Sequence, residues 1–118
     1  MDASAALAIF AALAQPTRLA GFRLLVASEP EGIPATELAR RIGVPQNTMS
    51  AHLAALSRAR LVSSHRTGRS VVYRADIAVA RELALYLLED CCGGRPEACE
   101  PVVRSLSACR ATWDAAHA

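Results

Sequence analysis

Apolar residues recur at helical spacing along most of this chain. Residues 4–14 are apolar on nearly every side, and Pro16 both ends that run and suits the first turn of a second helix, Pro16–Ala27. The turn residues of Ser28–Pro34 predict a loop, and a third helix follows over Ala35–Gly43, with Gly43 placed to cap its end. The first 43 residues therefore predict three helices.

The next 47 residues predict a fourth helix, a hairpin and a fifth helix. In the stretch PQNTMSAHLAALSRAR, residues 45–60, Met49, Leu53 and Leu56 fall on one face and are expected to point inward. The segments LVSSHR and SVVYR have strand-like content and are joined by TGR, with Gly68 at the bend. Ile77–Asp90 predicts a last helix that is more apolar than one buried stripe requires. The predicted fold class is mainly α with a small β-hairpin.

The chain length of 118 residues fits one domain with a short appendage. We expect a folded domain over residues 1–90 and a cysteine-containing, partly helical tail over residues 91–118. A domain of this size buries only about two-thirds of its unfolded surface. A second subunit would therefore add to its core.

Charge is segregated along the sequence. Residues 40–74 contain seven Arg and no acid, whereas residues 76–100 contain six acids and two Arg. A basic block of this length indicates a surface that faces a polyanion. The alternative is a solvated face that happens to lack acids.

The N-terminal apolar run resembles part of a secretory signal but lacks its charge pattern. Met1-Asp2 is acidic where such signals are basic, and twelve apolar residues are too few to span a bilayer. We therefore expect a cytoplasmic protein without a membrane partner. Cytoplasmic thiols are kept reduced, which disfavours a structural disulfide.

Two helices joined by a short Gly-containing turn, followed by a basic hairpin, match the winged helix-turn-helix plan. Gln46 and Asn47 can each contact adenine, and Thr48 and Ser50 can contact bases or phosphates. His52 lies beside the inward face, so both a packed core histidine and a phosphate contact stay open. The predicted DNA-contacting set is Gln46, Asn47, Thr48, Ser50, Ala51 and His52 on the helix, with Arg66, Arg69 and Arg74 around the hairpin for phosphates.

The stretches ALAQPTRLAGFRLL, TELARRIGVPQNTMSAHLAALSRARLV and GRSVVYR closely resemble the ArsR/SmtB family of metal-responsive bacterial repressors over about Leu13–Glu89. The resemblance implies a winged-helix homodimer built through the first and last helices and bound to an inverted-repeat operator. It also implies release of that DNA when an effector binds, and it strengthens the assignment of Ser50 and His52. Arg60 stands where the family usually has Gly, and Pro45 where it often has Ser or Thr.

The effector prediction depends on the cysteines. The helix TELARRI lacks the thiols of one common family site, and the last helix lacks the histidines of another. What remains resembles the arsenic-sensing members, which carry two adjacent Cys and a third a few residues later. Trivalent arsenic is thiophilic and takes three sulfurs, whereas zinc prefers four ligands. The predicted ligands of As(III), or of Sb(III), are Cys91, Cys92 and Cys99, with Cys109 as a possible extra ligand.

The cysteines also allow other uses. The adjacent thiols could sense oxidation through a vicinal disulfide, or the cluster could bind zinc or cadmium. A thiol oxidoreductase would need an electropositive site, whereas a helix C-terminus with Glu89 and Asp90 disfavours the reactive thiolate. We therefore expect a regulator and not an enzyme.

Overall fold

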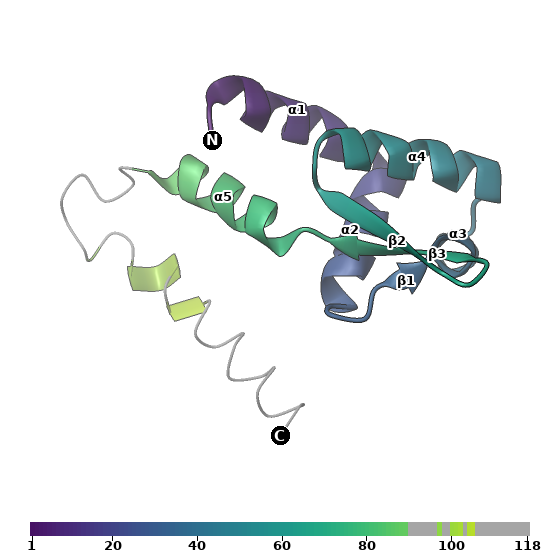
Figure 1. Cartoon of the computed structure of the whole chain (residues 1–118). Helices are drawn as coiled ribbons and strands as arrows, with labels where there is room; N and C mark the ends of the chain where they lie inside the picture. Colours follow the sequence, from purple (N-terminus) through teal and green to yellow (C-terminus); the bar gives the residue numbers. More distant parts are fainter. Residues whose placement is uncertain (90–96, 98–99, 103, 106–118) are drawn as a thin grey trace. The chain divides into compact units, whose positions relative to one another are not determined.

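The computed structural model describes residues 1–89, 97, 100–102 and 104–105 of the chain. It divides into two units, Met1–Tyr86 and Leu87–Ala118. Figure 1 traces the elements in chain order. In the predicted tail, the described residues 100–102 and 104–105 are helical.

The first two helices confirm the sequence prediction. They are α1 (Ala3–Leu13) and α2 (Pro16–Ala27), with Pro16 in the first turn of α2. Asp2 caps α1 by accepting a hydrogen bond from the Ala5 amide at 2.8 Å. At the junction, the Arg18 Nε donates to the Ala12 carbonyl at 2.6 Å, which satisfies a carbonyl at the end of α1.

The helix-turn-helix pair consists of α3 (Ala35–Ile42) and α4 (Gln46–Arg58). Gly43 ends α3 with a φ of 84°, as predicted. Arg60 has a φ of 65° just beyond α4 and is the non-glycine residue with positive φ among those described. Arg60 stands where the resembled family usually has Gly, and it takes the left-handed conformation that a Gly would adopt without strain.

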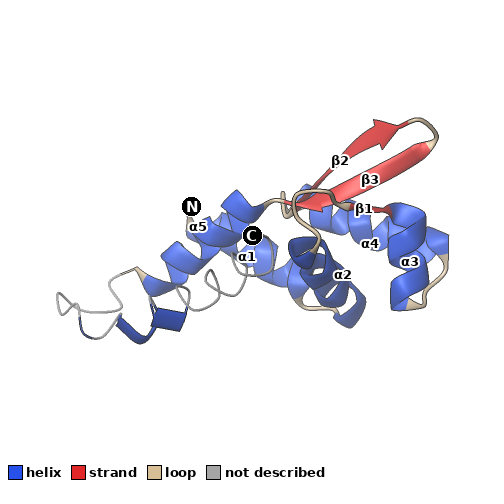
Figure 2. Ribbon diagram, turned by 90° about the horizontal axis from the view of Figure 1, so that it is seen from below, coloured by secondary structure: helices blue, strands red, loops and turns tan. Residues whose placement is uncertain are grey.

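The sheet has three antiparallel strands in the order β1-β3-β2, namely β1 (Ile33–Pro34), β2 (Val62–Thr67) and β3 (Ser70–Ala75). The predicted hairpin of β2 and β3 is confirmed, and it extends beyond the helices in Figure 2. The prediction of loop through Pro34 was wrong, because Ile33 pairs with Tyr73. That partner lies 40 residues away, so the local turn composition did not reveal the strand.

The core lies where α2, α3 and α4 meet the base of the sheet. Its fully buried large side chains are Leu25, Ile33, Leu38, Met49, Leu53, Leu56 and Leu61. The last helix, α5 (Ile77–Leu88), buries none of its residues and packs on the core through Val79, Ala80 and Leu83. Asp90, its predicted last residue, lies outside the described residues. Among the described residues, no single helix has both the length and the apolar composition needed to cross a membrane. Helices α1 and α2 reach that length and composition only together, as a pair bent by 102°.

Candidate nucleic-acid interface

Helix α4 has one buried face and one polar, exposed face. Met49, Leu53 and Leu56 are buried, as their spacing predicted. The opposite face presents five of the six predicted helix contacts as exposed side chains, namely Gln46, Asn47, Thr48, Ser50 and Ala51. Burial on one side fixes the rotation of α4, so these five side chains, four of them polar, are held outward.

The start of α4 lacks a side-chain cap. Pro45 occupies the N-cap position with a φ of −60° and has no side-chain hydrogen bond to the helix. The Asn47 Oδ1 accepts a hydrogen bond from the Thr48 amide at 2.9 Å. Amides in the first turn of a helix lack intrahelical partners, and a phosphate can supply the missing acceptor.

His52 lies at the boundary between the two faces. Its side chain is half-buried, and it forms no hydrogen bond to another described residue. A hydrogen-bonded core histidine was one of the two sequence interpretations. The structure gives His52 a position from which its ring reaches solvent.

The hairpin tip and the start of α4 lie at the same end of the first unit, together with α3 (Figure 1). Arg66 is exposed on β2, opposite Val71. Arg69 is exposed in the two-residue loop between Thr67 and Ser70, which begins with Gly68 at a φ of 62°. A two-residue loop of this kind with Gly first is typical of tight hairpins. Arg66 and Arg69 are therefore exposed on the hairpin at the end of the first unit where α4 begins.

Arg74 has an intramolecular partner. Its Nη2 and Nε donate to the two carboxylate oxygens of Glu29 at 2.9 and 3.3 Å, and this hydrogen bonding raises the pKa of Arg74. The side chain passes over Gly32, where a Cβ would lie 2.7 Å from the Arg74 Cγ. Arg74 therefore joins β3 to the loop after α2, and its predicted phosphate contact stays a prediction.

Two further arginines of the basic block are paired on α3. Glu37 accepts hydrogen bonds from both Arg40 and Arg41, chiefly Arg40, and this lowers the pKa of Glu37 from 4.5 to about 2. None of Glu37, Arg40 and Arg41 was among the predicted site residues. The signal was present, because acid and base stand three and four residues apart on one helix.

The predicted effector ligands Cys91, Cys92, Cys99 and Cys109 lie outside the described residues. Within the part of the chain that the structure describes, no three His, Cys, Asp or Glu side chains are grouped to hold a metal ion. The As(III) ligand set therefore stays a prediction from the sequence.

A family model described as a helix-turn-helix domain matches residues 4–65, more than half of the chain. The HTH-type transcriptional regulator KmtR of Mycobacterium tuberculosis is 34% identical over 77 residues, which is 65% of this chain and 57% of KmtR. This chain thus spans little more than half the length of that curated relative.

Two solved structures show the same fold. The ArsR-like transcriptional regulator from Rhodococcus sp. RHA1 is 28% identical with a TM-score of 0.64, over 87% of this chain and 92% of that one. The homodimeric winged helix-turn-helix DNA-binding domain Mb0332 from Mycobacterium bovis is 30% identical with a TM-score of 0.61, over 72% and 77% of the two chains. The family and these neighbours are DNA-binding transcriptional regulators, which are not enzymes. This chain belongs to the helix-turn-helix domain family, with the fold of the ArsR-type winged helix transcriptional regulators.

Proposed function

We propose that this protein is a cytoplasmic transcriptional repressor that binds operator DNA as a homodimer and releases it when trivalent arsenic binds its cysteines. The observation that carries the DNA-binding part is the two-faced α4. Its inner face is buried, and its outer face presents Gln46, Asn47 and Ser50 at the end where the hairpin tip lies. A helix presented in this way fits the major groove, with the hairpin beside the flanking backbone.

The homodimer is supported by apolar surface on the first and last helices. Helix α1 contains no charged residue, and it buries Ile9 while leaving Leu7 66% exposed and Phe10 exposed. On α5, Leu85 is 65% exposed and Leu88 is exposed. Apolar surface of this extent on two helices is typical of a protein interface. A second copy is the occupant we assign to it, since the similar domain of Mb0332 is homodimeric.

The effector part of the proposal depends on thiol chemistry. Cys91, Cys92 and Cys99 follow the residues of α5 in the sequence and supply three thiolates. Three soft sulfurs suit As(III) or Sb(III), whereas Zn²⁺ and Cd²⁺ favour a fourth ligand, for which Cys109 is available. Inverted-repeat DNA requires both α4 helices of the dimer to dock about one helical turn apart. A change in the separation of the two α4 helices therefore weakens DNA binding.

DNA binding is tested by fluorescence anisotropy with the duplex from upstream of the gene. Asn47→Ala is expected to lower operator affinity about 10-fold, or more, through loss of one bidentate base contact. The matched control is Ala54→Ser, a polar change on the exposed part of α4 further along the helix. Equal affinity of wild type and N47A for the operator would contradict the assignment of α4 as the base-reading helix.

Effector specificity is tested on the same complex with arsenite, antimonite, zinc, cadmium and a thiol oxidant. We expect arsenite to release the DNA, and the triple variant of Cys91, Cys92 and Cys99 to Ser to bind DNA but to ignore arsenite. Cys109→Ser serves as the matched control and should still respond. Release of the triple variant by arsenite would refute the ligand set, and release by zinc or oxidant alone would establish the alternative effectors.

A further inference from the structure

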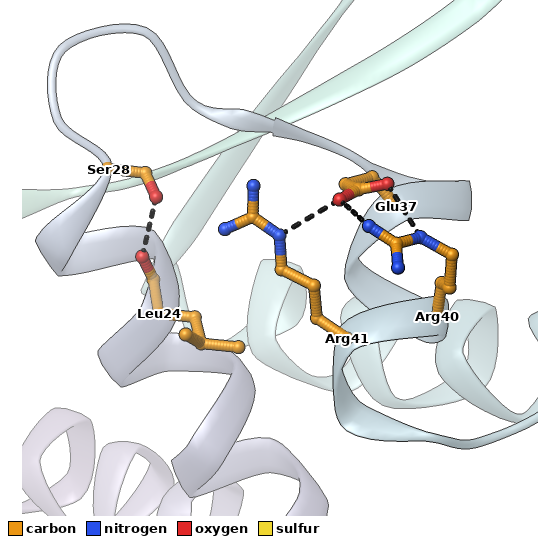
Figure 3. A network of polar contacts seen from close by, with 5 residues as sticks. All are labelled: Leu24, Ser28, Glu37, Arg40 and Arg41. Atoms are coloured by element: carbon orange, nitrogen blue, oxygen red, sulfur yellow. Dashed lines mark hydrogen bonds and ion pairs between the residues drawn. The ribbon is translucent and has the colours of Figure 1, made fainter.

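Glu37 forms an ion-paired cluster with two arginines on α3. Figure 3 shows the Arg40 fork facing both carboxylate oxygens, with the Arg40 Nε 3.0 Å from Oε2 and its Nη2 paired with Oε1. The Arg41 Nε donates to the same Oε1 at 3.0 Å from the other side. One carboxylate thus accepts three hydrogen bonds from two guanidinium groups.

The cluster lies where nucleic acid is expected to approach. Helix α3 is at the end of the first unit that carries the start of α4 and the hairpin tip (Figures 1 and 2). The Arg40 side chain is 72% exposed, Arg41 is 46% exposed, and Glu37 is 30% exposed. In the sequence from Ala35 to Ala75, Glu37 is the single acid among seven arginines. It is therefore the one negative charge on an otherwise basic segment.

A carboxylate and a phosphate compete for the same arginine donors. Both groups accept two parallel hydrogen bonds from the guanidinium fork, and in this structure Glu37 takes that position on Arg40. An exposed ion pair of this kind contributes little stability, so a polyanion with many charges can displace it at small cost. Arg40 is the more exposed of the two arginines and binds Glu37 through two nitrogens. It can therefore exchange two hydrogen bonds to the carboxylate for two to a phosphate.

We propose that Glu37 is a built-in counter-charge that occupies Arg40 in the free protein and is displaced from it by a DNA phosphate. The proposal rests on the DNA-binding function proposed above. Glu37 weakens binding to every duplex, because the contact for which it competes is with the backbone and carries no sequence information. Its effect is to hold down non-specific binding, which depends on such contacts.

A purely structural role for Glu37 predicts a different result. Glu37 also lies in the first turn of α3, whose N-cap Pro34 supplies no side-chain hydrogen bond. If Glu37 only stabilised that helix end, its replacement would lower thermal stability and would not raise DNA affinity in a manner that depends on Arg40. The two roles are therefore separated by measuring DNA affinity in the presence and absence of the Arg40 side-chain charge.

The test compares full-length wild type with E37Q, R40Q and the E37Q/R40Q double variant. Anisotropy is measured with a fluorescein-labelled 20-base-pair duplex of random sequence, from about 50 mM to 500 mM salt. In wild type the displaced Glu37 carboxylate takes up a cation, which offsets the counterion that the Arg40–phosphate contact releases. E37Q lacks this uptake, so its log–log salt slope should be steeper by up to about 0.9, and it should lose up to roughly eightfold more affinity than wild type over that range. At the lowest salt, E37Q should bind several-fold more tightly than wild type.

The double variant decides between displacement and simple removal of charge. Under the proposal, the gain caused by E37Q disappears when Arg40 is absent, and E37D, which keeps the charge, binds like wild type. A gain that persists in the R40Q background, or no gain with E37Q, would overturn the proposal while leaving DNA binding established. Failure of wild type itself to bind any duplex would overturn the proposed function together with this inference. Melting temperatures confirm that each variant is folded.

Discussion

Replacing Arg60 with Gly is expected to stabilise the protein. Arg60 directly follows the C-cap residue Ala59 of α4 and has a φ of 65°. Its amide donates to the Ser57 carbonyl at 2.9 Å, and the Leu61 amide donates to the Leu56 carbonyl at 3.0 Å. This pair of bonds closes the helix in the Schellman arrangement, which requires a left-handed residue at the position of Arg60.

The strain cannot relax, because the residues on either side are fixed. Leu56 and Leu61 are fully buried, so a change of φ at Arg60 would pull one of them out of the core. A left-handed conformation costs an L-residue about 1–2 kcal/mol. Glycine avoids that cost but loses about 0.5–1 kcal/mol more chain entropy on folding. The net gain from R60G is therefore about 0.5–1 kcal/mol.

Thermal and urea unfolding at one protein concentration measure this gain. For a domain of this size the increase in Tm is expected to be about 2–5 °C. R60A is the matched control, because it removes the guanidinium but keeps the Cβ that causes the strain. The reasoning is refuted if R60G is no more stable than wild type, or if R60A gains as much as R60G. In the second case, removal of the charged side chain and not relief of the backbone would be responsible.

Four other changes have defined outcomes. Gly21→Ala should stabilise the protein by about 0.5–1 kcal/mol, because the new Cβ would lie at an ordinary contact distance of 3.5 Å from its nearest neighbour, the Ile42 Cδ1. Gly32→Ala should destabilise it by more than about 1 kcal/mol, because φ is 80° and the Cβ would lie 2.5 Å from the Tyr73 carbonyl oxygen. Urea unfolding measures the stability of both glycine variants, and equal changes in the two would contradict the different surroundings of Gly21 and Gly32. Since the pKa of Glu37 is lowered from 4.5 to about 2, its ion pairs stabilise the fold above pH 4.5 and are lost as the pH falls toward 2; melts across this range should show a smaller loss in E37Q than in wild type. Leu85→Glu should lower the dimer fraction in sedimentation with unchanged circular dichroism, and an unchanged dimer would exclude α5 from the interface.

Local sequence signals predicted the helices and the hairpin because each depends on neighbouring residues. Pro16 marks the start of α2, Gly43 ends α3, and Gly68 stands in the hairpin loop. The spacing of Met49 and Leu53 predicted their burial, and with it the outward face of α4. The exposed helix positions of the candidate interface followed from this one rotation.

Contacts between distant segments could not be predicted in the same way. The strand at Ile33 forms by pairing with Tyr73, and Arg74 is bound to Glu29, 45 residues before it. Neither partner has a local pattern that identifies it. The sequence singled out Arg66, Arg69 and Arg74 for phosphates, whereas the structure pairs three arginines of the basic block with carboxylates, namely Arg40, Arg41 and Arg74.

The way α5 is held explains how binding beyond its end could reach α4. Its start is fixed to the end of α4, since the Asp76 amide donates to the Leu61 carbonyl at 2.8 Å and the Asp76 Oδ1 accepts from the Val79 amide at 3.2 Å. Its body is less constrained: no residue of α5 is buried, and an open hollow of about 420 Å³, lined in part by Ile9 and Arg60, lies between α1, the end of α4 and the start of α5.

Under the proposed function, α5 is tied at one end to the DNA-reading element and covered by a second subunit, so that subunit sets the direction of α5. An effector can shift an equilibrium only through a difference in affinity between two arrangements, and such a helix supplies two arrangements at low cost. Under the proposed function, arsenite release of DNA therefore requires the dimer. A Leu85→Glu variant that still binds arsenite should show no arsenite-dependent change in its residual DNA affinity. A full arsenite response from the monomer would place the coupling within a single subunit.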